Sequence, residues 1–278
     1  MKKITLLLLV CLIMCGCMRG RKEEIPTEDF PCNVGSLRVH YPPEKIAVLS
    51  PGLMNILKEL ALEKSVVAVY SSYESETLIK IGDEYCPDSG KIIESKAEYL
   101  LSFTELENKT INKLSENGVR VLVLNTPQTL GSLENLYSEI STLFYGTESG
   151  KEKGKAVFSQ YYSLLDKAKS FCSGKTYSYI KNRDLEASSG NLSAALLEYA
   201  FQSPASTLSL TELNPDFIFL DDSVDLTYLS SLEISEHLSA VLEGNVFGLS
   251  SEAFDDLSIA SANKLYELIT SKDSSEAA

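Results

Sequence analysis

A strand, a helix and a second strand follow one another within residues 45–73, and no other stretch constrains the fold as strongly. β-Branched residues predict a strand over residues 45–49, which a Ser-Pro-Gly turn ends. Apolar residues then recur at helical spacing from Leu53 to Leu62. Residues 65–70 are almost continuously apolar, which is typical of a buried strand. A helix between two such strands predicts a right-handed parallel crossover and therefore an α/β fold.

The chain repeats this alternation in two halves, which predicts an α/β fold of two small lobes with central, mostly parallel sheets. A Gly- and charge-rich break is expected over residues 146–154, and one long helix over residues 155–171 joins the halves. Further strands are expected at residues 98–103, 119–124, 176–180, 217–220 and 246–249, and further helices at residues 108–117, 133–144, 192–199, 207–213, 234–242 and 259–269. The expected division is a first lobe over residues 45–146, a connecting backbone helix over residues 147–173 and a second lobe over residues 174–278.

The N-terminus has the pattern of a lipoprotein signal peptide over residues 1–16. Two lysines precede an apolar run at residues 4–14, which is too short to span a bilayer as a mature helix. A glycine then precedes Cys17, which makes Cys17 the expected lipidation site after cleavage. An ordinary signal peptide or a buried helix are the alternatives. The polar, proline-containing segment 17–44 is expected to be a tether between the lipid and the folded body.

Charge and cysteine content limit the partners and the bonds of the exported chain. The net charge of −14 argues against nucleic acid as a partner. Export permits disulfides, and Cys32, Cys86 and Cys172 remain after Cys17. Their spacing matches no zinc pattern. A bridge between Cys32 and Cys86 would fix the N-terminal arm to the first lobe, and three unpaired cysteines are the alternative.

No combination of residues in the sequence predicts catalysis, so an enzyme is not expected. The two histidines are His40, in the expected tether, and His237, in an expected helix. Neither is placed beside a serine or cysteine nucleophile, and no Gly-rich phosphate loop is present. Two separated histidines are too few for a zinc or manganese site. Binding without chemistry, and without a resident cofactor, is the expected activity.

The segment IAVLSPGLMNILKELALEKSVVAVYSSY resembles the start of the mature substrate-binding proteins of ABC importers for iron–siderophore, heme and cobalamin. The resemblance extends over residues 45–269. The segment EYCPDSGKIIESKAEYLLSF aligns with a helix and strand of that family, and Asn214-Pro215-Asp216 resembles the family's Lys-Pro-Asp start of the corresponding strand in the second lobe. The resemblance implies two lobes joined by a rigid helix.

The same resemblance implies a function and a location. A lipid-anchored, monomeric protein would capture an iron chelate (a siderophore or heme) or cobalamin in the cleft between its lobes. It would deliver that ligand to an ABC permease in the membrane. The protein would be exported, and anchored to the outer face of the cytoplasmic membrane or located in the periplasm. A lipoprotein of this fold that no longer transports, and acts as a surface interaction or sensor module, is the alternative.

Residues that follow the strands are the expected ligand-binding residues, because ligands of open α/β sheets lie at the carboxyl ends of the strands. In the first lobe these are Pro51, Gly52, Leu53, Ser72, Tyr73, Phe103, Thr104, Glu105 and Asn125, and in the second lobe Arg183, Asn191, Asp222 and Ser250. The Tyr73 phenolate could ligate heme iron. A tyrosine at a strand end could equally pack in the cleft wall.

Family members carry one glutamate on the outer face of each lobe, where it pairs with an arginine of the permease. The aligned positions in this sequence are Gly90 and Leu208. One helical turn later stand Glu94 and Glu212, which gives the hypothesis that these two residues took over permease docking. Ordinary solvation of exposed helical glutamates is the alternative.

Overall fold

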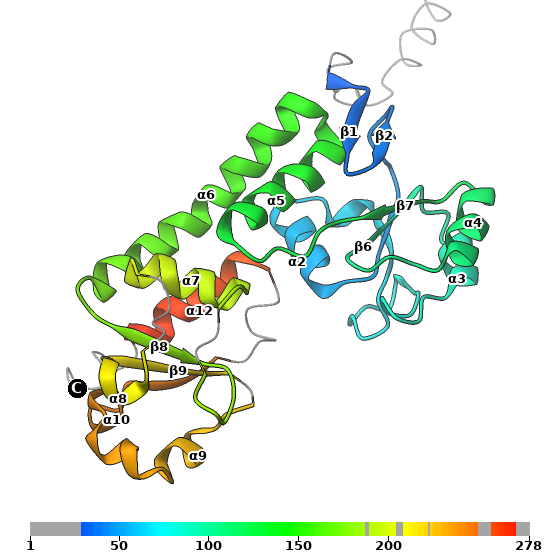
Figure 1. Cartoon of the computed structure of the whole chain (residues 1–278). Helices are drawn as coiled ribbons and strands as arrows, with labels where there is room; N and C mark the ends of the chain where they lie inside the picture. Colours follow the sequence, from blue (N-terminus) through cyan, green and yellow to red (C-terminus); the bar gives the residue numbers. More distant parts are fainter. Residues whose placement is uncertain (1–28, 187–188, 204–207, 222, 250–256, 271–278) are drawn as a thin grey trace, which may run out of the picture.

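The protein is described here by a computed structural model of two lobes, each built on a parallel β-sheet (Figure 1). The structure describes residues 29–186, 189–203, 208–221, 223–249 and 257–270. The predicted α/β fold with two lobes is confirmed. The signal peptide, Cys17 and the first part of the expected tether lie outside the described residues. Within the described ranges, no helix combines the length and the apolar character needed to cross a bilayer.

The first lobe contains a five-stranded sheet of order β5-β4-β3-β6-β7, in which all strands are parallel. Its elements are β3 (Ile46–Val48), α2 (Pro51–Glu59), η3 (Glu63–Ser65), β4 (Val66–Val69), β5 (Ile79–Lys80), α3 (Ser89–Glu94), β6 (Tyr99–Ser102), α4 (Asn108–Glu116) and β7 (Arg120–Val123). The parallel unit expected within residues 45–73 is β3-α2-β4. Pro51 is the first residue of α2, where its missing N–H would have no helical partner in any case.

The second lobe contains a three-stranded parallel sheet of order β10-β9-β8. Its elements are β8 (Tyr177–Ile180), α7 (Leu192–Phe201), α8 (Leu210–Leu213), β9 (Phe217–Asp221), α9 (Leu226–Ser230), η4 (Glu233–His237), α10 (Ser239–Leu242), β10 (Val246–Leu249) and α12 (Ile259–Thr270). The helix expected over residues 234–242 is divided into η4 and α10, because Leu238 between them has extended backbone geometry.

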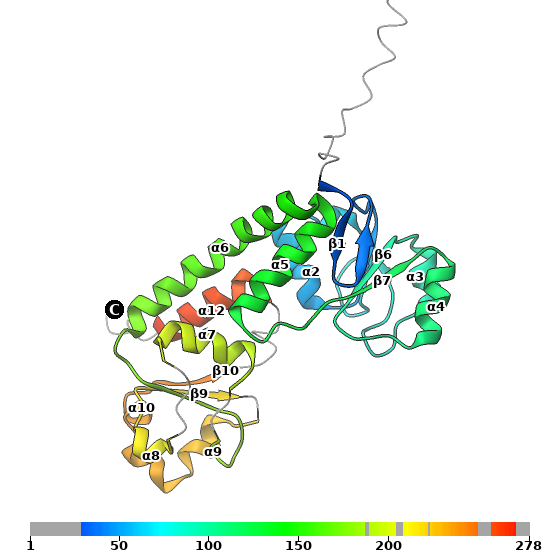
Figure 2. The ribbon, with the colours of Figure 1, turned by 45° about the horizontal axis from the view of Figure 1, so that its top comes forward.

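Two antiparallel helices, α5 (Leu130–Tyr145) and α6 (Thr147–Cys172), lie along both lobes (Figures 1 and 2). The break expected over residues 146–154 is wrong, since α6 already begins at Thr147. Its glycines serve close packing instead. A Cβ atom on Gly150 would lie 2.4 Å from the Cα atom of Thr142, and one on Gly154 would lie 2.6 Å from the Cα atom of Ser138. Glycine at these two positions lets α6 approach the backbone of α5.

A β-hairpin, β1 (Cys32–Val34) and β2 (Leu37–Val39), lies within the segment expected to be a tether (Figure 2). Cys32, Val34 and Val39 are at most 2% exposed and belong to the main hydrophobic core. Alternate residues of β1 therefore point into the body, where β1 packs against α5. The expectation of a tether up to residue 44 is corrected for this part of the segment. His40 is exposed directly after the hairpin.

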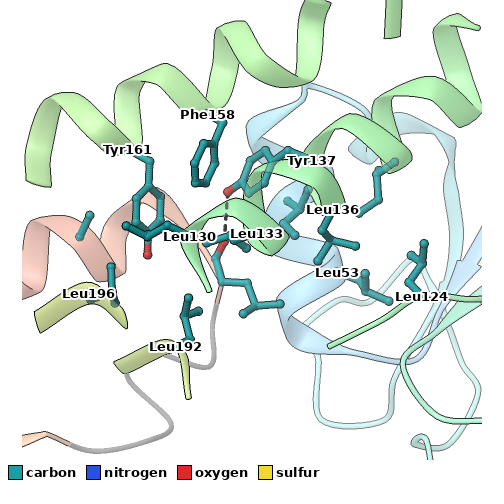
Figure 3. Close-up of a cluster of buried hydrophobic side chains, with 14 of the residues drawn as sticks. Leu53, Leu124, Leu130, Leu133, Leu136, Tyr137, Phe158, Tyr161, Leu192 and Leu196 are labelled. Carbon is teal, nitrogen blue, oxygen red and sulfur yellow. Dashed lines mark hydrogen bonds between the residues drawn. The ribbon is translucent and has the colours of Figure 1, made fainter. Parts of the chain in front are cut away.

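One continuous core joins the two lobes through α5 and α6 (Figure 3). Phe158 of α6 lies 5.1 Å from the ring of Tyr161 and 5.2 Å from the ring of Tyr137 on α5. Leu53 of α2 and Leu192 of α7 belong to the same core. Because apolar side chains of both lobes share this core, separating the lobes would expose it to water.

Candidate functional site

A cleft of about 710 Å³ lies between the lobes, at the carboxyl ends of β3, β6 and β7. The first lobe contributes the start of α2 and three loops, and the second lobe contributes the start of α7 and Leu257. The described residues that line the cleft are Ser50, Pro51, Gly52, Glu84, Tyr85, Phe103, Thr104, Thr126, Pro127, Gln128, Asn191, Leu192 and Leu257. This volume is typical of sites for small molecules, and the position follows the rule for open α/β sheets.

Residues at or just before the first turns of three helices line the cleft, because each of these helices follows a strand or loop that ends there. Ser50 is the N-cap of α2, and its side chain caps no backbone N–H. Asn191 is the N-cap of α7, and its Oδ1 accepts a hydrogen bond of 2.8 Å from the backbone N–H of Ala194. Thr129 and Ser132 form a capping box at the start of α5, directly after Gln128 of the lining. The cleft is therefore surrounded by polar groups and helix ends.

Glu84 fixes the loop that follows β5 to the end of β6. One carboxylate oxygen accepts a hydrogen bond of 3.0 Å from the Phe103 N–H, and the other accepts one of 3.1 Å from the Thr104 hydroxyl. In the same loop, Oδ1 of Asp83 accepts from the N–H groups of Tyr85 and Cys86 at 2.9 and 2.8 Å. These bonds present the Tyr85 ring, 91% exposed, at the cleft mouth.

The structure brings five of the thirteen predicted ligand-binding residues together in the cleft lining: Pro51, Gly52, Phe103, Thr104 and Asn191. Two more lie in adjoining grooves of about 330 Å³ each. Ser72 lines one of these grooves and Glu105 lines the other, and both grooves share Glu84 and Tyr85 with the cleft. Asn125 is exposed and does not line the cleft, whereas the adjacent Thr126 does.

Three predicted residues lie outside the cleft lining. Leu53 is fully buried in the core, since it points inward from the first turn of α2. The half-buried Tyr73 ring has Lys58 Nζ at 4.9 Å and Lys80 Nζ at 5.3 Å from its centroid, which matches wall packing better than a position facing a ligand. The Arg183 guanidinium stacks on the Tyr228 ring at 5.0 Å. Asp222 and Ser250 lie outside the described residues.

Sequence reasoning missed Glu84 and Tyr85. Both follow β5, which is two residues long and lies within a charged segment that reads as a loop. A rule that looks behind each predicted strand cannot find residues behind a strand that the sequence does not predict. The signal that could have found them is the alternation of apolar and charged residues in Ile79-Lys80-Ile81, a segment that pairs with β4.

The two expected docking glutamates are exposed on different lobes. Glu94 is the last residue of α3, and Gly90 is its second residue. The Gly90 N–H donates a hydrogen bond of 3.0 Å to the Asp88 carboxylate. The carboxylate of Glu212 accepts hydrogen bonds from the Ser209 N–H and hydroxyl at 3.1 and 2.8 Å. These bonds lower the pKa of Glu212. Leu208, before α8, is 55% exposed.

The three cysteines of the folded body are free thiols, so the expected Cys32–Cys86 bridge is not formed. Cys32 is buried, with its Sγ 3.5 Å from the carbonyl oxygen of Thr142, whereas Cys86 is exposed on the loop after β5. The hairpin buries Cys32 against α5, whereas Cys86 is exposed on a loop of the first lobe. Among the described residues, no group of three His, Cys, Asp or Glu side chains could hold a metal ion.

No protein-family model matches the chain, and no curated protein matches it in sequence. Solved structures do match it. The iron uptake ABC transporter substrate-binding protein of Streptococcus pneumoniae is 17% identical, and the alignment covers 86% of this chain and 98% of that one with a TM-score of 0.61. The petrobactin-binding protein of Bacillus subtilis is 16% identical, with 84% and 93% covered and a TM-score of 0.60.

The periplasmic vitamin B12 binding protein of Vibrio cholerae is 17% identical to this chain. The alignment covers 85% of this chain and 99% of that one, with a TM-score of 0.55. The descriptions of all three name binding proteins, and that of the Streptococcus pneumoniae protein names an ABC transporter. The likeness extends over both lobes and the helices that join them, so this chain has the two-lobed fold of the substrate-binding proteins of ABC importers.

Proposed function

We propose that this protein binds a metal chelate, either an iron complex such as a siderophore or heme, or cobalamin, and delivers it to an ABC permease. The observation that carries the proposal is the cleft of about 710 Å³ between the lobes, at the carboxyl ends of parallel strands. The similar structures support the ligand class, since their descriptions name iron uptake, petrobactin and vitamin B12.

The contacts between the lobes support capture in a largely preformed site. The core shared through α5 and α6 holds the lobes together. In addition, Glu59 at the end of α2 accepts hydrogen bonds from the Tyr137 hydroxyl and from the Ile259 N–H at the start of α12. Closure around a ligand would therefore be a small hinge motion rather than a large one.

The location belongs to the same proposal. A lipid on Cys17 would hold the exported protein at the outer face of the cytoplasmic membrane. Glu94 and Glu212 would contact the permease, one from each lobe, because both side chains are exposed.

A second candidate is a lipoprotein of the same fold that does not transport. The observation that favours it is the identity of the residues aligned with the family's docking glutamates, Gly90 and Leu208. In addition, the Glu212 carboxylate is already engaged in the cap of α8. A permease and an ATPase encoded beside this chain would favour transport, and their absence would favour the second candidate.

Thermal unfolding with a ligand panel tests the proposal. The chain from Met18 onward retains every described residue, and the panel contains ferric siderophores, hemin, cobalamin and divalent metal ions. A ligand present at 100 times its Kd adds about 2.7 kcal/mol to the free energy of unfolding. For a chain of this length that raises Tm by about 5–10 °C. No stabilisation by any chelate in the panel would contradict the proposal and favour the second candidate.

A further inference from the structure

The charged side chains around the cleft are all of one sign. Within the described ranges, those that line the cleft and its two adjoining grooves are Asp83, Glu84, Glu105 and Glu107. The other lining residues are apolar, hydroxyl, amide, aromatic or thiol side chains and glycine. This wall therefore carries four formal negative charges and no formal positive charge among the described residues.

Hydrogen bonds rather than basic side chains hold the two central carboxylates. Glu84 accepts from Phe103 and Thr104, and Asp83 accepts from two backbone N–H groups of its own loop. Within the part of the chain that the structure describes, ion pairs lie elsewhere, between Lys91 and Asp88 and between Lys151 and Glu148. The negative charge at the cleft is thus not neutralised by a neighbouring cation.

Three basic side chains of the two lobes have contacts outside the cleft lining. Lys80 donates to the Tyr73 carbonyl oxygen. Lys80 and Lys58 both lie over the Tyr73 ring. Arg183 stacks on Tyr228. Lys181 and Arg183 follow β8, and neither is among the residues that line the cleft or its two adjoining grooves.

The helix ends produce a weaker field of opposite sign. A helix N-terminus is equivalent to about half a positive charge, and its effect falls off within the first turn. The starts of α5 and α7 already donate backbone N–H groups to Thr129 and Asn191. Such ends favour neutral oxygen atoms on a ligand without outweighing four full carboxylates.

We propose that the ligand is a metal complex without net negative charge, whose exterior presents oxygen atoms and apolar groups. This inference rests on the proposed function and narrows it. A ferric tris-hydroxamate, which is neutral or singly positive, and a corrinoid fit this description. A ferric tris-catecholate carries three negative charges, and heme carries two propionates, so both would place uncompensated negative charge against Glu84 and its neighbours.

Calorimetric titration of the chain from Met18 onward tests the inference with four probes: a ferric tris-hydroxamate, cyanocobalamin, a ferric tris-catecholate and hemin. At least one of the first two should bind at least tenfold more tightly than either of the others. Raising the salt concentration from 50 to 200 mM should weaken the binding of a cationic probe and leave that of a neutral probe unchanged. Tighter binding of the catecholate or hemin would overturn the charge inference alone. Binding of none of the four would overturn the proposed function together with it.

A matched pair of charge reversals adds a test that does not depend on the choice of chelate. Glu105 is exposed at the groove beside the cleft, and Glu116 is exposed at the far end of α4. At low salt, Glu105→Lys should strengthen binding of the anionic probes, and weaken binding of a cationic one, by about two- to fivefold, while Glu116→Lys should leave both unchanged. Equal effects of the two reversals would overturn the inference.

Discussion

The carboxylate of Glu59, the last residue of α2, accepts a hydrogen bond of 2.7 Å from the backbone N–H of Ile259, the first residue of α12. The two residues are 200 positions apart and belong to different lobes. Glu59 also accepts a hydrogen bond from the Tyr137 hydroxyl, which lies 3.1 Å from the carbonyl oxygen of Leu257. An acidic side chain of the first lobe thus caps a helix of the second lobe, at the point where both meet α5.

Replacing Glu59 by glutamine should destabilise the protein, because the charged acceptor at the start of α12 is lost. Hydrogen bonds to charged groups contribute about 1.5–3 kcal/mol, and the glutamine amide retains part of this. We expect the free energy of unfolding to fall by about 1–2 kcal/mol, measured by urea denaturation. Glu63→Gln, at an exposed position four residues later, is the control and should change it by less than about 0.5 kcal/mol. Equal effects of both substitutions would show that the contact between lobes does not stabilise the fold.

Gly154→Ala should destabilise the protein by about 1–3 kcal/mol, since the added methyl group would push α6 away from α5. Its Cβ atom would lie 2.6 Å from the Cα atom of Ser138, which is helix backbone and cannot turn away. Gly131→Ala is the matched control in the first turn of α5, where the nearest atom would be 4.0 Å away. That control should stabilise the helix by up to about 1 kcal/mol, so thermal melting of the two variants should shift in opposite directions. A higher Tm for Gly154→Ala would contradict the close packing.

One thiol should react rapidly with Ellman's reagent in the native chain from Met18 onward, and three after denaturation. Cys86 is exposed, whereas burial raises the pKa of Cys32 and raises that of Cys172 to about 12, which suppresses the reactive thiolates. Cys86→Ser should abolish the fast reaction. A native chain without a fast thiol, which gains two thiols on reduction, would show that Cys32 and Cys86 are bridged after all.

Glu139 is half-buried and lines the same hollow as Lys151 and Lys155. Its burial should make the protein less stable at neutral pH than in mild acid. Burial raises the pKa of its carboxyl above the ordinary value of 4.5. The folded state therefore binds more protons than the unfolded state between these two pKa values, so this contribution to stability falls as pH rises through the folded-state pKa.

Glu139→Gln should remove that contribution. Relative to the wild type, the variant should gain stability at pH 7 and gain none near pH 4, measured by urea denaturation at both pH values. Glu152→Gln, exposed on α6, serves as the control and should show no such pH-dependent difference. A difference between Glu139→Gln and the wild type that is the same at both pH values would contradict this assignment.

Charge reversal at Glu94 and Glu212 together should slow uptake of the bound chelate by cells without changing its Kd for the purified protein. The reason is that both glutamates are exposed outside the cleft, one on each lobe. Because Glu212 also caps α8, its reversal will lower stability slightly, and the Kd measurement serves as the check that the cleft is intact. Normal uptake by the double variant would exclude these residues from permease docking.

Most strands and helices could be predicted in order from the sequence because β-branched runs and helical periodicity are local properties, whereas the two-residue strand β5 could not. The short β-hairpin at Cys32–Val39 could not, since its strands are three residues long and owe their burial to α5. The sequence predicts a break where α6 begins, for a related reason. Glycine commonly ends helices, and only the position of α5 shows that Gly150 and Gly154 serve packing.

The candidate site was predictable where a residue directly follows a predicted strand, as at Pro51 and Phe103. It was not predictable where tertiary contacts decide the direction of a side chain. Tyr228 turns Arg183 away from the cleft lining, and two lysines pack against Tyr73. Glu84 enters the site through hydrogen bonds to a strand almost twenty residues later, which no local pattern encodes.

The position of α12, the last of the described helices, bears on how this chain completes its folding. The Ser261 hydroxyl lies 2.7 Å from the Tyr161 hydroxyl on α6, and Ile259 donates to Glu59, so α12 is inserted between elements made much earlier. A polypeptide cut before residue 259 would lose both hydrogen bonds and the packing of α12 against α6. Because these contacts reach α2 of the first lobe and the connecting helix α6, the loss of α12 would weaken the attachment of the two lobes to each other as well as the second lobe itself.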